Sequence, residues 1–461
     1  MRKIFKPFIQ KVGPFALSSG KINVVKLSGG TVIGQGVAIL TIPLAARIFG
    51  ATVIGDWAIL YATAIIVNAF SDLGLINAVM ISEDEQEIKI LISIITLLGI
   101  LSATLASLGL LFLCVSLHIE LVNVNPFFAA TYLFSNILLQ QQIQLSSTWQ
   151  NLHGHYQTLM WNPVFTNGLF GLMLVVFGVM GFVEYGYFLA WVIGQLAAFI
   201  HIKRNMPKSI HYIRLMDFKA ILIKHKAFIK FQMPGTFIAN VNQQLPVYLT
   251  NAFFGTEMVG YYSMTIKILQ MPITLVGVAI GKVFYQTITG MQHNIGELRD
   301  YVKRNLNKLM WLSAIPMFFI VLIGDLVIKA VLGENWVPAG VYIRILALQN
   351  IFLFLYTVYY GLPIILHKQH AFLLVNVSKV SLMFMAFPIG KYVFSDVRVA
   401  FGLLSMSTII LNVVYISYLL HCIGINGKKS ALQICSIFLL ILFLSLALRG
   451  FLYRFGMVSG M

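Results

Sequence analysis

Charged residues are scarce in this sequence, and acidic residues are the scarcest among them. Of the 461 residues, 10% are charged, with 15 Asp and Glu against 32 Lys and Arg. A soluble domain carries about 25% charged residues, and a single core of this size cannot leave so little polar surface for water. The composition therefore excludes an ordinary soluble protein.

Cysteine is also rare, and the usual motifs of cofactor sites are missing. The three cysteines lie in apolar stretches without metal-ligand spacing, so neither a metal site nor a disulfide framework is expected. The phosphate-binding pattern G-x4-G-K-[ST] is absent, and Gly281-Lys282, which comes closest, lies inside an apolar stretch. No loop exceeds about 30 residues, which leaves no room for a soluble catalytic domain. We therefore expect no metal, no cofactor and no enzymatic activity.

What the sequence has in abundance is apolar residues, which make up 59% of it. They form runs of about 20 residues, the length that crosses ~30 Å of hydrocarbon. The runs are continuous and do not alternate with period two, which excludes a transmembrane barrel. We predict an all-α polytopic membrane protein with about 12 core transmembrane helices and an extra C-terminal helix. The predicted spans are 28–48, 54–81, 88–117, 121–143, 158–181, 184–202, 229–253, 259–289, 308–332, 338–366, 370–392, 399–423 and 430–448.

One short phrase occurs twice with identical spacing. In Phe49–Trp57 and in Phe254–Tyr262, Phe-Gly is followed after four residues by Gly, then by any residue and an aromatic. Each copy joins the first two spans of a set of six, so both copies face the same side of the membrane. A tight turn with an aromatic interface anchor explains one copy, but two at matching positions indicate duplication. We predict two parallel six-helix halves around a central cavity.

Lysine and arginine set the predicted orientation and boundaries. They gather before residue 27, in 203–230 and in two later loops on the same side, so the N-terminus and the 203–230 linker are expected in the cytoplasm of a bacterial inner membrane. The net charge of +17 lies in loops and does not indicate a nucleic-acid partner. The predicted segments are a basic cytoplasmic arm (1–27), an N-terminal half with its linker (28–215), a C-terminal half (216–425) and a C-terminal helix and tail (426–461).

The last predicted span departs from this charge pattern. It would place Arg449 and Arg454 outside, against the positive-inside rule. Whether it spans the membrane or lies at the interface stays open at this point.

Ionisable side chains inside the predicted spans are candidate site residues, because each costs roughly 2.5–3.5 kcal/mol to insert. Lys267 and Lys379 lie too deep to reach the headgroups easily, and we expect them to face a water-filled cavity or to form a buried structural pair. Three further cations lie nearer the ends of spans, where reaching toward the headgroups explains them equally well: Arg47, Lys282 and Arg344. Asp72 is the one carboxylate expected well inside a span, as a charge partner of Lys282 or a coupling site.

Side-chain amides cluster in the seventh predicted span. Asn240 and Gln244 belong to a group of four amides within five residues, which cannot all face lipid, and Pro246 is expected to kink the helix there. The run Gln140–Gln144 is expected near the cytoplasmic interface, facing headgroups. Several cations with few carboxylates favour an anionic substrate. Amides and aromatics such as Trp57 suit sugar hydroxyls and ring faces, although interface belts also explain the aromatics.

These residues resemble a known family. The second half resembles the pattern of bacterial polysaccharide flippases at Met233-Pro234, Asn240, Pro246, Phe254-Gly255, Gly260-Tyr261-Tyr262, Lys267, Pro272, Gly277 and Val283-Phe284-Tyr285. These flippases are the O-antigen and lipid-linked oligosaccharide translocases of the multidrug/oligosaccharidyl-lipid/polysaccharide exporter superfamily. Gly333-Glu334-Asn335-Trp336 resembles the same family's turn between spans nine and ten. Pro43, Arg47, Gly50, Gly55 and Asp72–Leu75 match its opening pattern more weakly.

The resemblance implies a substrate and a mechanism. The substrate would be undecaprenyl pyrophosphate bearing a short oligosaccharide, which alternating access flips to the outer leaflet for O-antigen or capsular polysaccharide synthesis. Lys267 and Lys379 would contact pyrophosphate or acidic sugars, with Arg47, Lys282 and Arg344 in support and Asn240 and Gln244 bonding sugars or neighbouring helices. The implied partners are membrane lipids and the polymerase and chain-length proteins.

The chain also departs from the family. Many members have Arg where this chain has Lys267, and some carry an Arg and a Glu where it has Gly74 and Ile76. Three alternatives stay open: a cation-coupled multidrug exporter of the same superfamily, a membrane polysaccharide polymerase or ligase, and a flippase of peptidoglycan precursors.

Overall fold

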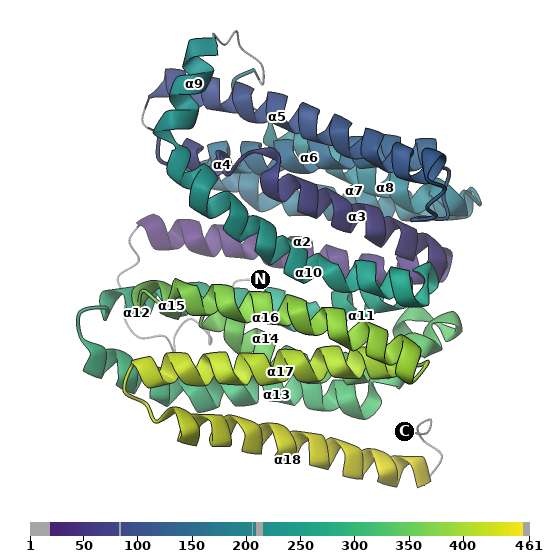
Figure 1. Cartoon of the computed structure of the whole chain (residues 1–461), viewed down its shortest axis with the longest axis vertical. Helices are drawn as coiled ribbons and strands as arrows, with labels where there is room; N and C mark the ends of the chain where they lie inside the picture. The colour runs from purple at the N-terminus through teal and green to yellow at the C-terminus, as the bar shows by residue number, and fades with distance from the viewer. Residues whose placement is uncertain (1–18, 83, 205, 209–214, 455–461) are drawn as a thin grey trace.

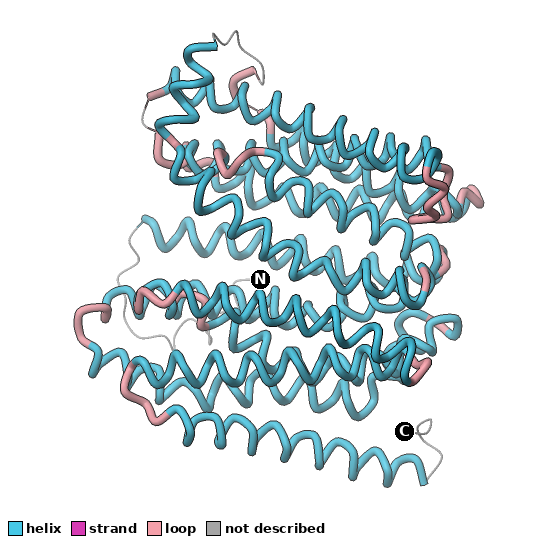
Figure 2. The backbone as a smooth tube through the Cα atoms, viewed as in Figure 1, coloured by secondary structure: helices cyan, strands magenta, loops and turns pink. Residues whose placement is uncertain are grey.

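A computed structural model describes residues 19–82, 84–204, 206–208 and 215–454, with only the backbone placed for 19–32 and 215–216. Within these ranges every regular element is helical (Figure 2). Residues 1–18 of the predicted basic arm lie outside the described part. In the described part the first helix extends from Ser19, nine residues before the predicted start of the first span.

The helices follow the predicted order of spans. Those of the first half are α2 (Ser19–Ile48), α3 (Ala51–Ser71), α4 (Ile76–Val79), α5 (Glu85–Leu111), α6 (Pro126–Leu152), α7 (Tyr156–Val179) and α8 (Val183–Ile202). The linker forms α9 (Leu215–Lys224). The second half contains α10 (Met233–Phe254), α11 (Thr256–Pro272), α12 (Val278–Gly290), α13 (Ile295–Leu332), α14 (Val337–Val358), α15 (Leu362–Ile365), α16 (Gln369–Pro388) and α17 (Val397–Cys422), followed by α18 (Gly427–Arg454).

Ten helical stretches of the described chain are long and apolar enough to cross a membrane. The helices α2, α6 and α10 are not among these ten, although each is 22 to 30 residues long. In α2 the stretch Ile33–Ile48 is apolar but shorter than a membrane span. The helices α6 and α10 are less apolar because they carry the runs of amides. The multi-span helical membrane fold is therefore confirmed, whereas the count of twelve plus one stays a prediction.

Two bundles of helices lie one above the other in Figure 1, with α2 and α10 between them. In the upper bundle α3 packs on α6 and α5, and α7 packs on α8 and on α2. In the lower bundle α14 packs on α13 and α17, and α16 packs on α17. The bundles meet chiefly where α3 contacts α10 and α11. The turns that follow α2 and α10 lie at the same end of the molecule, opposite the linker helix α9 (Figure 1).

The glycines of the repeated phrase form the contact between α3 and α11. A Cβ atom at Gly55 would overlap the carbonyl oxygen of Thr256, and one at Gly260 would overlap that of Ala51. Ala51 and Thr256 are the first residues of the two helices and hold equivalent places in the two copies of the phrase. Only glycine permits this approach of two backbones. We call this contact the glycine crossing.

The second predicted span, 54–81, is wrong in its C-terminal part, because the helix α3 ends before Asp72. Leu73 and Gly74 adopt left-handed conformations with φ of 53° and 76°. Asp72 then accepts hydrogen bonds from the backbone N–H of Gly74 (3.2 Å) and Ile76 (3.0 Å), which begins the short helix α4. A carboxylate that captures nearby backbone N–H groups offers the chain an alternative to helix continuation.

The glutamine run also lies elsewhere than predicted. Because α6 continues to Leu152, the run falls in the middle of the helix and not at its end. Gln141 and Gln142 are buried and donate hydrogen bonds to Ser71 (3.1 Å) and Thr96 (3.1 Å) on α3 and α5. Their role is helix packing, because a buried amide needs partners that lipid does not provide.

The linker helix α9 packs on the first bundle. Glu87, at the start of α5, accepts hydrogen bonds from Lys224 (2.6 Å) and from the buried His225 (2.8 Å). Ile221 belongs to the same apolar cluster as Leu75 and Ile92. The predicted boundary between residues 215 and 216 falls at the start of α9 and stays a prediction.

The last helix is held by a buried ion pair. Arg449 is fully buried, and its guanidinium donates two parallel hydrogen bonds to the carboxylate of Asp325 (2.9 and 2.7 Å) and a third to the carbonyl of Leu322 (2.8 Å). The pair joins α18 to α13, on which α18 packs. Since α18 is also one of the ten spanning candidates, these contacts favour a packed helix over an interfacial one.

Replacing Arg449 alone is expected to destabilise the protein strongly. An Arg449→Met variant leaves the Asp325 carboxylate buried without its cation, which costs about 3–5 kcal/mol. The double variant with Asp325→Leu removes both charges and is expected to regain most of that loss. Thermal unfolding of the detergent-purified variants measures both effects, and equal melting temperatures for the single and double variants would contradict this account.

Candidate functional site

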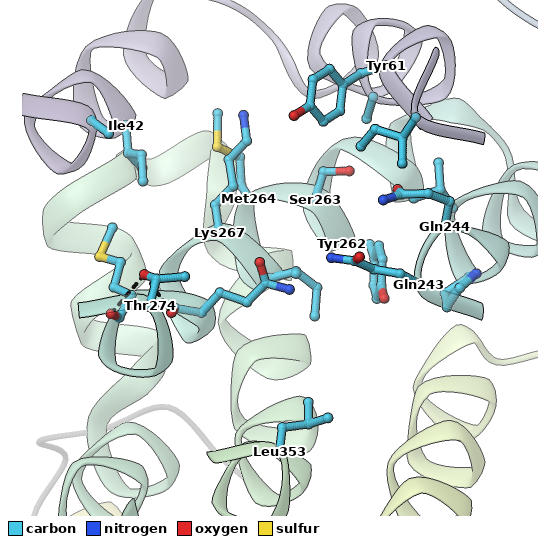
Figure 3. A pocket seen from close by; sticks show the side chains of 18 of the residues that line it. Ile42, Tyr61, Gln243, Gln244, Tyr262, Ser263, Met264, Lys267, Thr274 and Leu353 are labelled. Carbon is cyan, nitrogen blue, oxygen red and sulfur yellow. Dashed lines mark hydrogen bonds between the residues drawn. The ribbon is translucent and has the colours of Figure 1, made fainter. Parts of the chain in front are cut away.

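A cavity of about 800 Å³ lies between the two bundles. Residues of α2, α3, α7 and α8 line one side, and residues of α10, α11, α14, α16 and α17 line the other. Figure 3 shows side chains around this space, among them Lys267, Gln243, Gln244 and Tyr61. Both halves of the chain therefore contribute to one central cavity.

The charged residues that line the cavity are all cationic. Among the described lining residues they are Lys267 and Lys379, and no Asp, Glu or His lines it. The two deepest cations that the sequence indicated thus line the same cavity. In such a space, where water is limited, an unneutralised positive charge attracts an anion more strongly than at a free surface.

Lys267 extends from α11 into an aromatic cluster of the first half. Its ammonium donates a hydrogen bond to the hydroxyl of Tyr187 (3.0 Å) and lies 4.2 Å from the ring centroid of Trp57. Among the described residues, no ion pair joins Lys267 to a carboxylate. Cation–π contacts and a neutral hydroxyl therefore hold its charge, and an anion can take their place.

The aromatic cluster around Lys267 is continuous. Trp57 stacks on Tyr61 (4.8 Å between centroids) and meets Trp191 edge to face (5.3 Å). Tyr187 contacts Trp57 edge to face (5.2 Å), and Phe170 packs on Trp191 (5.2 Å). All five residues line the cavity. Sugar rings stack on aromatic rings of this kind, and Tyr61 and Trp191 are the partly exposed members of the cluster.

Lys379 also comes from the second half and lies on α16. It is 5% exposed, donates a hydrogen bond to the side-chain carbonyl of Asn412 (2.9 Å) and lies 4.7 Å from the ring of Tyr356. One turn earlier on the same helix, Asn376 accepts a hydrogen bond from Asn242 of α10 (2.7 Å). Neutral partners therefore hold both cavity lysines.

The two predicted amides lie in different places. Gln244 is 9% exposed and lines the main cavity. Asn240 donates a hydrogen bond to the carbonyl of Ile65 (3.3 Å) and lines a second, smaller cavity. Asn242 and Gln243, between them on α10, line the main cavity.

The three supporting cations do not line the main cavity. Arg47 is exposed at the end that carries the repeated phrase, and Lys282 is exposed on α12. Arg344 is half-buried on α14, and its Nε atom has no hydrogen-bond partner in the described part of the chain. Asp72 accepts a hydrogen bond from the first backbone N–H of α4, and none of the ion pairs among the described residues joins it to Lys282.

Two buried carboxylates inside the predicted spans were missed in the sequence, where only Asp72 was expected well inside a span. Asp56 is 2% exposed and accepts hydrogen bonds from the backbone and side chain of Asn123 (2.9 and 3.2 Å). Asp325 pairs with Arg449. The position of Asp56 inside the repeated phrase was a usable signal, since the phrase marks the start of a helix.

Contacts between the halves close the cavity at the end that carries the phrase. Besides the glycine crossing, Arg47 donates a hydrogen bond to the carbonyl of Ala330 (2.9 Å), and the indole of Trp336 donates one to the carbonyl of Ala46 (2.8 Å). The first bond joins α2 to the last turn of α13, and the second joins α2 to the turn between α13 and α14. Arg47 therefore contributes to closure and not to the lining of the cavity.

Two helical bundles around a central cavity, with ten helical stretches long and apolar enough to cross a membrane in the described chain, define a polytopic helical membrane fold. Residues 44–340 match the sequence model of a protein family that is described as "Polysaccharide biosynthesis protein". This match covers more than half of the chain, and the chain belongs to that family.

Individual proteins agree with the family and the fold. The teichuronic acid biosynthesis protein TuaB of Bacillus subtilis (strain 168) is 23% identical over 234 residues, which are 50% of this chain and 47% of TuaB. The chain thus spans about half the length of the curated relative it matches. A structure of the lipid II flippase MurJ, in an inward closed conformation, has a TM-score of 0.66 at 14% identity and covers 95% of this chain and 94% of MurJ.

An inward-facing multidrug resistance MATE transporter of the MOP superfamily has a TM-score of 0.65 at 13% identity, with 90% of this chain and 98% of that chain covered. These likenesses confirm the predicted fold of two helical halves around a cavity.

Proposed function

We propose that this protein flips an undecaprenyl-pyrophosphate-linked oligosaccharide from the inner to the outer leaflet of a bacterial cytoplasmic membrane, with its N-terminus in the cytoplasm. The observation that carries the proposal is the charge of the central cavity. Lys267 and Lys379 are the charged groups of its described lining. A cavity with this lining favours a ligand that brings negative charge with it.

The pyrophosphate is the part of such a substrate that suits the two lysines. Each lysine costs roughly 2.5–3.5 kcal/mol to place within the membrane, and its neutral partners offset only part of that. An ammonium bonds the charged oxygens of a phosphate more strongly than the neutral hydroxyl of Tyr187 or the neutral side-chain carbonyl of Asn412. The sugars would lie against the aromatic cluster, and the lipid chain would stay in the bilayer.

The position of Lys267 suggests how binding is coupled to movement. Its helix, α11, belongs to the second half, whereas Trp57 and Tyr187 belong to the first. A phosphate that takes the ammonium away from these rings removes one contact that joins the halves. The ligand then binds the separated state better than the closed one, as a population shift requires. The halves would alternate between closure at the phrase end and closure at the linker end.

The composition of the cavity also bears on the alternatives. A cation-coupled exporter of cationic drugs is expected to place carboxylates in its cavity, and the described lining has none. A polymerase or ligase is expected to carry a large outward loop with catalytic residues. The described helices follow one another through short connections, apart from the linker.

Deleting the gene from its host is expected to abolish surface polysaccharide and to leave its lipid-linked precursor in the cytoplasmic leaflet, because synthesis continues while transfer stops. Extraction of undecaprenyl-linked lipids measures the amount of accumulated precursor. Its digestion in sealed inverted vesicles, in which the cytoplasmic leaflet faces outward, measures the leaflet in which it lies. Complementation with the wild-type chain is the control. Normal polysaccharide without precursor accumulation would refute the proposed function.

A further inference from the structure

A second cavity lies at the linker end of the first bundle, between α3, α4, α6 and α10. Its volume is about 170 Å³, equal to the liquid volume of about six water molecules and enough for a single sugar ring. Amides and one hydroxyl dominate its lining: Asn68, Asn77, Gln140, Gln144, Asn240 and Thr236. We call it the amide cavity.

The amide cavity has one charged residue in its described lining, and that residue is acidic. It is Asp72, and the carboxylate accepts hydrogen bonds from the backbone N–H of Gly74 and Ile76. Each carboxylate oxygen accepts one of these bonds. A metal cation would have to compete with them, and an anion would meet the negative charge, so a neutral polar ligand fits best.

Some lining side chains are held by hydrogen bonds to one another, whereas others make none within the described part of the chain. Asn68 donates a hydrogen bond to Gln140 (3.4 Å), which in turn donates one to Asn136 (2.9 Å). Asn77 and Gln144 are exposed, and within the described part of the chain their side chains make no hydrogen bond. Thr236, also exposed, is equally free. An amide both donates and accepts, which matches the two neighbouring hydroxyls of a sugar ring.

The amide cavity adjoins the main cavity. Ile65 lines both, and Asn240 of the amide cavity donates a hydrogen bond to the Ile65 carbonyl (3.3 Å). Ala239, the preceding residue on α10, lines the main cavity. A ligand whose anionic part lies between Lys267 and Lys379 can therefore extend toward the amides.

We propose that the amide cavity binds one neutral sugar of the lipid-linked oligosaccharide while the pyrophosphate occupies the main cavity. The proposal rests on the proposed function and adds a separate place for sugar recognition. The cationic site would bind the pyrophosphate, and the amide cavity would bind the sugar.

The test compares two lipids on the purified full-length protein in nanodiscs. One is the oligosaccharide lipid extracted from host cells that lack this chain, and the other is undecaprenyl pyrophosphate without sugar. The test variant combines Asn77→Ala, Gln144→Ala and Thr236→Ala, three exposed side chains whose loss leaves the fold intact. Gln86→Ala is the matched control, since Gln86 is an exposed amide near the same end that lies outside both cavities.

The wild type and the control are expected to bind the oligosaccharide lipid about tenfold more tightly than the bare lipid, the size expected for one or two net hydrogen bonds. The triple variant is expected to lose most of this preference, with its affinity for the bare lipid unchanged. A tenfold preference that survives in the triple variant would overturn the sugar site, as would equal binding by the wild type. If the wild type binds neither lipid, the proposed function itself fails and the sugar site with it.

Discussion

A variant with both Lys267→Gln and Lys379→Gln is expected to lose surface polysaccharide while reaching the membrane at the wild-type level. Each lysine would contribute about 1.5–3 kcal/mol to binding a charged phosphate. Losing both corresponds to about a 100-fold or larger loss of affinity, since each 1.4 kcal/mol is tenfold. Glutamine keeps a hydrogen-bonding group of similar length, so the change removes charge and little volume.

The measurement is polysaccharide per cell, normalised to the protein level by immunoblot. Lys282→Gln is the matched control, because Lys282 lies in a span but is exposed and does not line the cavity. It is expected to retain activity. Normal polysaccharide in the double variant would show that the cationic cavity is not where the substrate binds.

A methyl group at either glycine of the glycine crossing is expected to open the end of the protein that carries the repeated phrase. A Cβ at Gly55 or Gly260 would overlap a carbonyl oxygen of the facing helix, so the helices must move apart. Overpacking of this kind costs typically about 1–3 kcal/mol, which shifts a closed population toward the open state by roughly 5- to 150-fold. Gly50→Ala is the matched control, because no atom lies within 4 Å of a Cβ built there.

Labelling of a single cysteine at Ala45 measures this opening. Ala45 is 2% exposed and lines the main cavity near the phrase end. The three native cysteines are first replaced in a background that still supports polysaccharide synthesis. A membrane-impermeant thiol reagent added outside intact cells is expected to label Gly55→Ala and Gly260→Ala variants several-fold faster than the Gly50→Ala control. Equal labelling rates would contradict a role of the crossing in closure.

The positions of the cavity lysines could be predicted from depth along the spans, and the structure places both of them on one cavity. The surroundings of Lys267 could not be predicted, because Trp57 and Tyr187 come from spans far apart in the sequence. A single sequence contains the helical period and the apolar length of each span, but not which helices become neighbours. The same limit concealed the pair between Asp325 and Arg449, whose partners are 124 residues apart.

Local competition explains the other departures. Asp72 lies within an apolar run that predicts continuous helix, yet its carboxylate captures two backbone N–H groups and ends the helix. The glutamines of α6 suggested an interface because polar residues usually lie there. Buried partners on neighbouring helices, such as Ser71 for Gln141, make the middle of the helix equally acceptable for them.

The repeated phrase has a further consequence for how the two halves meet. In the glycine crossing, Gly55 meets the carbonyl of Thr256, and Gly260 meets that of Ala51, the residue equivalent to Thr256. This is the geometry of an isologous interface, in which residue i touches j and j touches i, as in a two-fold dimer. The chain thus behaves at this point as a covalently joined dimer of its own halves. Neither half alone holds a complete contact, so the interface forms or separates as one unit.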